Sequence, residues 1–371
     1  MGTNRVRVLV ALAGAAAAVA AFTAAPAGAA PSRAGVVFVQ TDDPAGNHVV
    51  VYDRSESGTL TTAGQYATGG HGGKLDGSVV DHLASQGSVA YDAARHALYV
   101  TNAGSDSITV FGVNGDRLTR RGTAWSAGSF PVSIAIHGDR LFVLDARDGG
   151  RIQGYLRIGA ALVRIPAWQH GLGLDGTLTP EFTSTPGQVA FSPDGSRLLV
   201  TTKGNTSSIE VFRAGYGRLG APVVTALPGA VPFALTFRSS DRVVLAEAGT
   251  NAVATLRLRT DGHLDVLHTA ATNAAATCWI VASADHVWVS NAGSGTLSGY
   301  RVSAGGSLTG TGSTATDGGT VDAVVTRHFL YVQTGAAGIV DEFRIGSGGA
   351  LTRIGSVTVP NGVGAEGIAA S

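Results

Sequence analysis

The residues of this chain that could do chemistry stand at equivalent positions in a series of similar segments. One set comes directly after short apolar runs: Thr41, Asn102, Asp145, Thr202, Glu247, Asn291 and Thr334. A second set begins the preceding apolar runs: Ser88, Ser133, Gln188, Ala234, Trp279, Asp322 and Gly367. Carboxylates in such positions can transfer protons, and Asn, Gln and Thr can hydrogen-bond a hydroxyl-rich ligand. The alternative is that these side chains hold the backbone amides of turns.

Other kinds of site have little support in the sequence. The ten His residues show no H-x-H or H-E-x-x-H spacing, so we expect neither a bound metal nor a cofactor. Cys278 is the single cysteine and is expected to pack as a small hydrophobic side chain. Trp279 beside it could stack on a ligand near a channel mouth or could fill that channel.

Seven copies of one segment position these residues. The stretch 98–119, LYVTNAGSDSITVFGVNGDRLT, is typical: two apolar runs with period-2 alternation are separated by Asn, Gly, Ser and Asp. One equivalent position recurs at intervals of 43–45 residues, with two longer intervals of 61 and 57, at Val39, Val100, Val143, Val200, Leu245, Val289 and Val332. One more apolar run precedes most copies, which makes four strands per unit. A period near 44 predicts a propeller or array.

The two ends of the chain predict how the array closes. The first copy begins at its second strand, VVFVQT, while residues 365–371, AEGIAAS, fit the missing first strand. Closing the ring in this way removes the exposed strand edges that an open stack would leave. We therefore predict an all-β, seven-bladed β-propeller of four-stranded antiparallel blades, with the C-terminal strand completing the first blade. An open β-solenoid or a pair of sandwiches is the alternative.

Two insertions lengthen the loops between blades, at 69–85 and 166–185. In an antiparallel four-stranded blade, the loop to the next blade lies on the same face as the end of the second strand. Both insertions are therefore expected to overhang the rim that carries the polar residues. Long irregular loops on a rigid scaffold often carry function, although solvent-exposed decoration is equally compatible with their composition.

The N-terminal segment predicts that the protein is exported from the cell. Residues 1–29 contain Arg5 and Arg7, an Ala-rich apolar run and an A-G-A site, which is typical of a signal peptide rather than a membrane anchor. We expect cleavage after Ala29, a single domain over residues 30–371, no later membrane span and a secreted monomer.

Charge is balanced, with 26 Lys and Arg against 26 Asp and Glu, so a nucleic-acid partner is not expected.

The repeats also resemble a known family. LYVTN followed by SDSITVF, and FSPDGSRLLV before the next copy, are similar to the YVTN-type repeats of lactonase-type seven-bladed propellers. That family includes propeller 6-phosphogluconolactonases and carboxymuconate cyclases, and the resemblance covers about 35–371. It implies the propeller fold and a rim-facing site for a small molecule such as a sugar lactone or sugar acid.

The resemblance also implies which residues would act in a family enzyme. The family's signature is P-R-H at the start of a first strand, with V-N-E at the end of the second. Here Pro186 matches, Gly187 and Gln188 stand in place of the Arg and His, and Thr202 and Lys203 replace the Asn-Glu pair. Gln exchanges no proton near neutral pH and Gly binds no carboxylate, so lactonase activity is not expected at this position.

We therefore expect a secreted, lactonase-like repeat protein that acts mainly as a scaffold for a small molecule or a cell-surface ligand. The alternative is a lactone hydrolase or cycloisomerase with a rebuilt active site. The candidates for residual catalysis are Gln188, Lys203, Glu247, Asp145 and His71. The candidates for ligand binding are Asn102, Asp145, Gln188, Lys203, Glu247, Trp279, Asn291 and Asp322.

Overall fold

The computed structural model describes residues 1–3 and 33–371. Apart from its first three residues, the expected signal peptide lies outside this described part, and its cleavage stays a prediction. Residues 33–371 lie within one compact unit. No helix in the described residues reaches the length and apolar character needed to cross a membrane.

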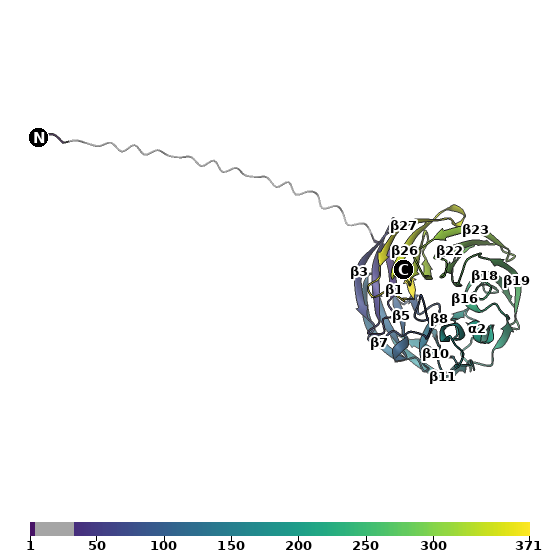
Figure 1. Cartoon of the computed structure of the whole chain (residues 1–371). Helices are drawn as coiled ribbons and strands as arrows, with labels where there is room; N and C mark the ends of the chain where they lie inside the picture. The colour runs from purple at the N-terminus through teal and green to yellow at the C-terminus, as the bar shows by residue number, and fades with distance from the viewer. Residues whose placement is uncertain (4–32) are drawn as a thin grey trace. The chain divides into compact units, whose positions relative to one another are not determined.

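Within residues 33–371 the strands form seven separate four-stranded antiparallel sheets, which are the blades of a propeller (Figure 1). Blade 1 consists of β28 (Ile368–Ala370), β1 (Arg33–Gln40), β2 (His48–Ser55) and β3 (Leu60–Ala67). Blade 2 consists of β4 (Val89–Asp92), β5 (Ala97–Asn102), β6 (Ser107–Asn114) and β7 (Arg117–Trp125). Blade 3 consists of β8 (Pro131–His137), β9 (Arg140–Asp145), β10 (Arg151–Ile158) and β11 (Ala161–Gly171).

The remaining four blades repeat this order. Blade 4 consists of β12 (Gln188–Phe191), β13 (Arg197–Thr201), β14 (Ser208–Arg213) and β15 (Val223–Ala226). Blade 5 consists of β16 (Pro232–Ser239), β17 (Arg242–Glu247), β18 (Ala252–Leu258) and β19 (Leu264–Ala271). Blade 6 consists of β20 (Thr277–Ser283), β21 (His286–Asn291), β22 (Thr296–Val302) and β23 (Leu308–Ala315). Blade 7 consists of β24 (Thr320–Val325), β25 (Phe329–Thr334), β26 (Ile339–Ile345) and β27 (Leu351–Thr358).

Burial changes from strand to strand as the packing of a propeller requires. Each residue of β9, RLFVLD, is buried, because a second strand is covered by neighbouring blades on both faces. The fourth strand β7, RLTRRGTAW, alternates with mostly exposed positions, because it forms the outer edge of its blade. Apolar clusters accordingly lie between adjacent blades; one joins Phe233, Trp279 and Val289 of blades 5 and 6.

The predicted ring closure is confirmed. β28 pairs antiparallel with β1, with Ile368 opposite Val39 and Ala370 opposite Val37. The backbone amide of Gln40 donates to the Gly367 carbonyl at 2.9 Å, which extends the pairing by one bond. In Figure 1 the yellow C-terminal end lies beside the purple β1, so the two ends of the repeat share one sheet.

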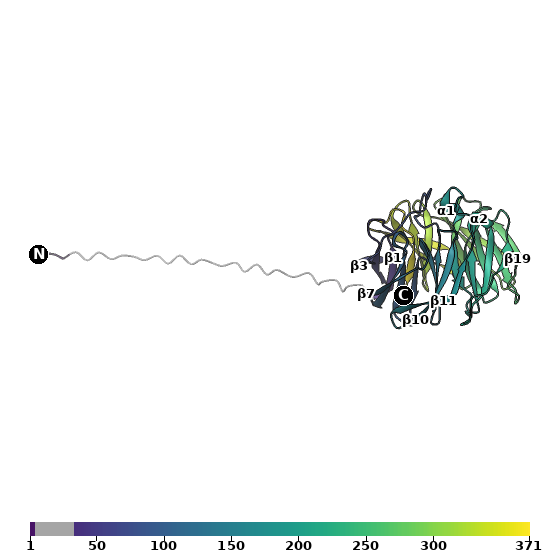
Figure 2. The ribbon, with the colours of Figure 1, turned by 90° about the horizontal axis from the view of Figure 1, so that it is seen from below.

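The structure differs from the expected pattern in and near the insertions. Residues 166–171 of the second insertion continue the outer strand β11, with an irregular register opposite Gln153 and Tyr155. Two single-turn helices, α1 (Glu181–Ser184) and α2 (Lys203–Thr206), also interrupt the all-strand pattern. Both helices lie on one face of the ring (Figure 2), which we call the insertion face. Segments of four residues are too short to show helical periodicity in sequence.

Candidate functional site

The end of the first insertion and the two residues that follow it close the central channel on the insertion face. Residues 85–87, which we call the plug, bond to the first strands of several blades. The Gln86 amide donates to the Gly187 carbonyl at 3.0 Å, and the Gln86 side-chain oxygen accepts from the Ile280 amide at 2.8 Å. The Gly87 carbonyl accepts from the Ile134 amide at 2.8 Å. The plug therefore bridges blades 3, 4 and 6 across the middle of the ring.

Apolar anchors hold the rest of this insertion in place. Leu75 and Leu83 are fully buried in a cluster with Phe130, Val132 and Val189 of blades 3 and 4. The burial of two leucine side chains stabilises the insertion by roughly 3–6 kcal/mol at most. This insertion is thus part of the core rather than a mobile surface loop.

The plug is also joined to the C-terminal segment. The Glu366 carboxyl accepts hydrogen bonds from the Ser85 hydroxyl at 3.0 Å and from the Ser85 amide at 3.2 Å. The Glu366 amide donates to Asp42 at 2.9 Å, and the His82 amide donates to the Gly364 carbonyl at 2.8 Å. The C-terminal segment that closes the ring and the plug that closes the channel are therefore joined by hydrogen bonds.

Several buried carboxyls surround this junction. Burial raises the pKa of Asp42, of Asp81 and of Glu366, and the pKa of Glu366 is raised further by the neighbouring charges of Asp81 and Asp322. Burial raises the pKa of Asp322 to about 7, against the opposing effect of backbone amide donors. Such carboxyls are held largely protonated at mildly acidic pH. Among the described residues, no group of three or more His, Cys, Asp and Glu side chains has a metal-binding arrangement.

Lys203 lies beneath the plug and makes three hydrogen bonds. Its ammonium donates to the Ala84 carbonyl at 2.7 Å, the Phe182 carbonyl at 2.6 Å and the Thr185 hydroxyl at 2.8 Å. It is 1% exposed, and burial lowers its pKa to about 8 despite the nearby carboxylates. The three donors of an ammonium group are thereby used within the protein, so Lys203 joins the two insertions and is not accessible to a ligand.

The other positions that match the family signature are also used for packing. The Gln188 side-chain oxygen accepts from the Leu235 amide at 2.6 Å, which ties blade 4 to blade 5. Gly187 has no space for a side chain, because a Cβ there would overlap the Phe233 carbonyl oxygen and lie 2.9 Å from the Thr201 hydroxyl. An arginine could not occupy this position without displacement of a neighbouring blade.

Two predicted ligand-binding residues hold strands within their own blades, and one of them, Asn102, also bonds to Asn47 of the neighbouring blade 1. The Asn102 side chain contacts Asn47, Ser107 and Thr109 at 3.0–3.2 Å. Asn291 makes the corresponding contacts in blade 6, accepting from the Thr277 hydroxyl at 2.6 Å and donating to Ser298 at 2.9 Å. Both residues are fully buried. The sequence leaves open whether such residues bind a ligand or hold the backbone of turns. The contacts of Asn102 and Asn291 match the structural role.

The remaining predicted residues lie apart from one another. Trp279 is 2% exposed, donates its indole N–H to the Ser85 carbonyl and packs on Phe233 at 4.7 Å between ring centroids, so it helps to fill the channel. Glu247 is buried and accepts from the Thr250 hydroxyl at 2.8 Å; burial raises its pKa. His71 is exposed, and its ring nitrogen lies 3.1 Å from the Pro44 carbonyl oxygen.

Asp145 is the most unusual of the predicted residues. It is completely buried at the end of β9, and neither carboxyl oxygen has a hydrogen-bond partner of standard geometry within the described chain. Burial raises its pKa to about 7, although the nearby Ser126 hydroxyl opposes the shift. A carboxyl in such surroundings is kept neutral at mildly acidic pH.

One cavity on the insertion face lies between the loop that joins β9 to β10 and the second insertion, and we call it the rim pocket. It has a volume of about 210 Å³. The loop between β9 and β10 forms one wall with Ala146, Arg147, Asp148 and Gly149, and the second insertion forms the other with Leu174, Asp175, Gly176, Leu178, Glu181, Ser184 and Thr185. The pocket therefore uses the insertion that the sequence singled out, but none of the predicted site residues.

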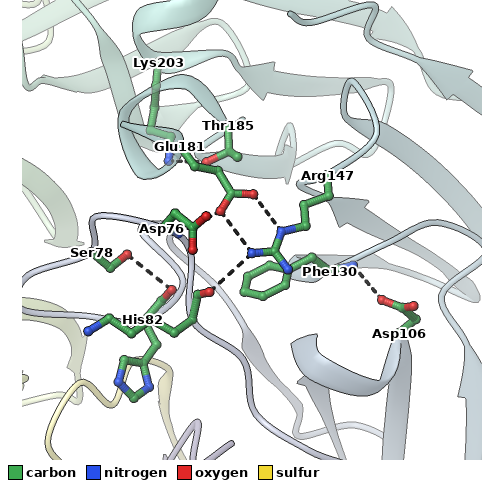
Figure 3. A network of polar contacts seen from close by, with 10 residues as sticks. Asp76, Ser78, His82, Asp106, Phe130, Arg147, Glu181, Thr185 and Lys203 are labelled. Carbon is green, nitrogen blue, oxygen red and sulfur yellow. Dashed lines mark hydrogen bonds and ion pairs between the residues drawn. The ribbon is translucent and has the colours of Figure 1, made fainter. Parts of the chain in front are cut away.

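Arg147 and Glu181 hold the two walls together (Figure 3). The Arg147 guanidinium donates to the two Glu181 oxygens at 2.6 Å and 3.0 Å, and it lies 4.4 Å from the centre of the Phe130 ring. The same carboxylate accepts from the Asp76 amide at 2.7 Å, which joins the first insertion to the second. Its hydrogen bonds with Arg147 lower the pKa of Glu181, so it stays ionised at neutral pH.

Charge in the rim pocket is negative overall. The positive charge of Arg147 is matched by Glu181, and the remaining charged side chains, Asp148 and Asp175, are acidic and exposed. Asp175 accepts from the Thr177 amide and hydroxyl, and these hydrogen bonds lower its pKa. The sequence holds a weak signal for this pocket: Arg147 and Asp148 follow the predicted residue Asp145, and Asp175 and Glu181 lie in the predicted insertion.

Comparisons with known proteins agree with this architecture. Residues 45–157 match the family model described as Lactonase, 7-bladed beta-propeller. None of the curated proteins matches the chain in sequence. A Lactobacillus plantarum protein is similar in structure with a TM-score of 0.72 and 20% identity, over 92% of this chain and 100% of that one.

Two solved structures with named activities are also similar. The periplasmic gluconolactonase of Pseudomonas aeruginosa has a TM-score of 0.70 and 18% identity, over 91% of this chain and 98% of that one. Virginiamycin B lyase from Staphylococcus aureus has a TM-score of 0.52 and 14% identity, over 74% of this chain and 84% of that one. At these identities the likeness concerns the fold. The chain therefore has the seven-bladed β-propeller fold, its residues 45–157 match the lactonase propeller family, and the resemblance found in its repeats is confirmed.

Proposed function

We propose that this lactonase-like propeller binds a small, hydroxyl-rich, uncharged or cationic molecule in the rim pocket and does not hydrolyse phosphorylated sugar lactones. The observation that carries the proposal is the closure of the positions that match the family's catalytic residues. Gly187 has no room for a side chain, and the Gln188 side-chain oxygen and the Lys203 ammonium are used in buried hydrogen bonds. A general acid–base group must reach the substrate, and these residues cannot.

The size and charge of the rim pocket support the choice of ligand. Its volume of about 210 Å³ is below the 300–1,000 Å³ typical of sites for drug-sized ligands, so it suits a molecule of monosaccharide size. An anionic sugar would meet the exposed carboxylates of Asp148 and Asp175, while Arg147 is already paired with Glu181. The charge therefore favours a neutral or amino sugar over the sugar acids that the resemblance implies.

We also propose that the protein is exported and acts as a monomer outside the cytoplasm. The N-terminal segment supports export, as does the likeness to a protein described as periplasmic. The second candidate function, a lactone hydrolase or cycloisomerase with a rebuilt site, would need an accessible proton donor or base. In the rim pocket, Asp148 or Asp175 would have to act as that proton donor or base.

Calorimetric titration with a defined set of probes tests this function. Glucose and glucosamine should bind, gluconate and 6-phosphogluconate should not, and hydrolysis of 6-phosphogluconolactone should equal the uncatalysed rate. The double variant Asp148→Asn, Asp175→Asn should weaken glucosamine binding by about tenfold or more, because two attractive charges are lost. The Asn at 175 keeps the oxygen that accepts from Thr177, so the loop should remain folded.

Asp261→Asn is the matched control, because Asp261 is exposed and lies far from the insertions in the loop between β18 and β19. It should bind glucosamine as the unchanged protein does. Lactone hydrolysis well above background that disappears in the double variant would instead establish the rebuilt enzyme. Tighter binding of gluconate than of glucosamine would also contradict the proposal.

A further inference from the structure

A second groove lies on the face opposite the insertions. It is formed by the ends of the first strands β4 and β8, the turns that follow them, and the loop between β14 and β15. First strands begin on the insertion face and end on the other, so the groove is separated from the rim pocket by the length of the blades. Its volume is about 770 Å³, more than three times that of the rim pocket.

Tyr216 forms one side of this groove. It is 67% exposed, yet it is held at both ends: its hydroxyl donates to Asp139 at 2.6 Å, and the Arg140 guanidinium lies 5.3 Å from the centre of its ring. Arg140 is itself fixed, because it donates to the carbonyls of Ala214 and Gly195 at 2.8 Å and 3.0 Å. An exposed aromatic ring that is already ordered loses little conformational entropy when a ligand stacks on it.

A buried ion pair forms the other side. Arg157, 5% exposed, donates to Asp92 at 2.6 Å, and the second oxygen of Asp92 accepts from the amides of Ala94 and Arg95. Tyr91 packs beside this pair, with its ring 5.3 Å from that of Phe38. The geometry of both sides is thus set before any ligand arrives.

The groove presents ring surfaces next to planar polar groups whose charges balance. Its charged side chains are two carboxylates, Asp92 and Asp139, and two guanidiniums, Arg95 and Arg157. Among the described residues, no hydrogen bond from the Arg95 guanidinium to a protein group is found, and the Asp139 carboxylate accepts from Tyr216 through one of its two oxygens. A neutral ligand rich in hydroxyls satisfies both groups without a net charge to compensate.

We propose that this groove binds a neutral oligosaccharide, with a sugar ring stacked on Tyr216 and hydroxyls bonded to Asp139 and Arg95. The C–H faces of a pyranose are apolar while its rim carries hydroxyls, which matches an aromatic ring flanked by a carboxylate and a guanidinium. The open groove of about 770 Å³ takes more than one sugar unit. The proposal is independent of the rim pocket, since it uses residues on the opposite face.

Titration calorimetry with cellohexaose, maltohexaose and chitohexaose tests the proposal, with oligogalacturonate as the anionic comparison. At least one neutral oligosaccharide should bind, and Tyr216→Ala should weaken that binding by about tenfold, as expected for a lost stacking contact. Tyr216→Phe keeps the ring but removes the bond to Asp139, so it should lose only about threefold.

Trp125→Ala is the matched control, because Trp125 is also an exposed aromatic, 59% accessible, and does not line the groove. Neither this variant nor the rim-pocket variant Asp148→Asn, Asp175→Asn should change oligosaccharide binding, while the melting temperature shows that each variant is folded. Binding of none of the three neutral probes at about 10 mM overturns the proposal. Preferential binding of oligogalacturonate, or equal loss in Trp125→Ala, overturns it as well.

Discussion

At the scale of single residues, polar side chains that suggest catalysis in the sequence are largely used to hold the propeller together. Asn102 and Asn291 hold strands within their blades, Gln188 joins two blades, and Lys203 joins two insertions. A buried polar group without a partner costs about 1–3 kcal/mol, so a channel lined with such groups must pair them internally or with water. The chain pairs most of them internally.

Substitution at Gly187 tests how tightly the family's catalytic position is packed. Gly187→Ala should lower the free energy of unfolding by about 1–3 kcal/mol, because the added methyl group overlaps the Phe233 carbonyl. Chemical denaturation measures this change. Gly310→Ala is the control, since a Cβ at that position meets nothing within 4 Å, and it should change stability little. Equal stability of the two variants would contradict the packing seen here.

The restored variant Gly187→Arg, Gln188→His, Lys203→Glu follows from the same contacts. It should show no hydrolysis of 6-phosphogluconolactone above background, because the Arg cannot be placed and the new carboxylate would lie beneath the plug. A folded triple variant with measurable activity would show that the channel opens more easily than its hydrogen bonds imply.

At the scale of elements, the plug and the C-terminal segment stabilise one another. Removal of residues 364–371 should cost several kcal/mol, since it opens the inner edge of blade 1 and also removes Glu366 from Ser85. Thermal unfolding measures the loss. A truncated protein with an unchanged melting temperature would exclude the closure as a source of stability.

Glu366 separates the contribution of the plug from that of the strand. Burial and nearby carboxyls raise the pKa of Glu366, so a neutral side chain of the same shape is suitable there. Glu366→Ala should destabilise the protein by about 1–3 kcal/mol because the Ser85 amide loses its acceptor, whereas Glu366→Gln should cost less than half of that. A larger cost for Gln than for Ala would show that this carboxyl acts as a charged group.

At the scale of the whole molecule, stability should depend on pH through the buried carboxyls. The pKa values of Asp42, Asp81, Asp322 and Glu366 are raised in the folded state. These groups contribute their full stabilisation when the pH is below their pKa values in the unfolded chain, near 4. That contribution is lost as the pH rises through their pKa values in the folded protein. The melting temperature should therefore fall between pH 5 and pH 8.

Two other groups, Lys203 and His170, change the pH dependence of stability in the opposite direction to the buried carboxyls. The pKa of Lys203 is lowered to about 8, so its titration increases stability only above that pH. The lowered pKa of His170 opposes the fall, but it is one partly exposed group against four buried carboxyls. Asp322→Asn should make the melting temperature less dependent on pH, which calorimetry at pH 5, 6, 7 and 8 can measure; a melting temperature that rises over this range in the unchanged protein would contradict the prediction.

Export is also a property of the whole chain. The mature protein should begin at Ala30, within a few residues, and should be found outside the cytoplasm. Intact-mass analysis of protein from the producing cell tests this expectation. A mass that includes residues 1–29 would contradict it.

The repeat was sufficient to predict seven blades and four strands per blade, and its incomplete copies at the two ends of the chain predicted closure by the last strand. These features follow from the apolar period of two along each strand and the recurrence near 44 residues, which are local properties of the chain. The second strands are strongly apolar for a reason that can be deduced in advance: both of their faces are covered.

The location of the sites was decided by the tertiary structure. Whether Gln188 or Lys203 faces a ligand depends on residues 84–87, which are about one hundred or more positions away in sequence and bond to Lys203 and to Gly187. In the same way, the rim pocket and the Tyr216 groove combine side chains from loops of different blades. Local sequence determines which residues reach a loop, but packing between distant loops determines which of them remain open to solvent.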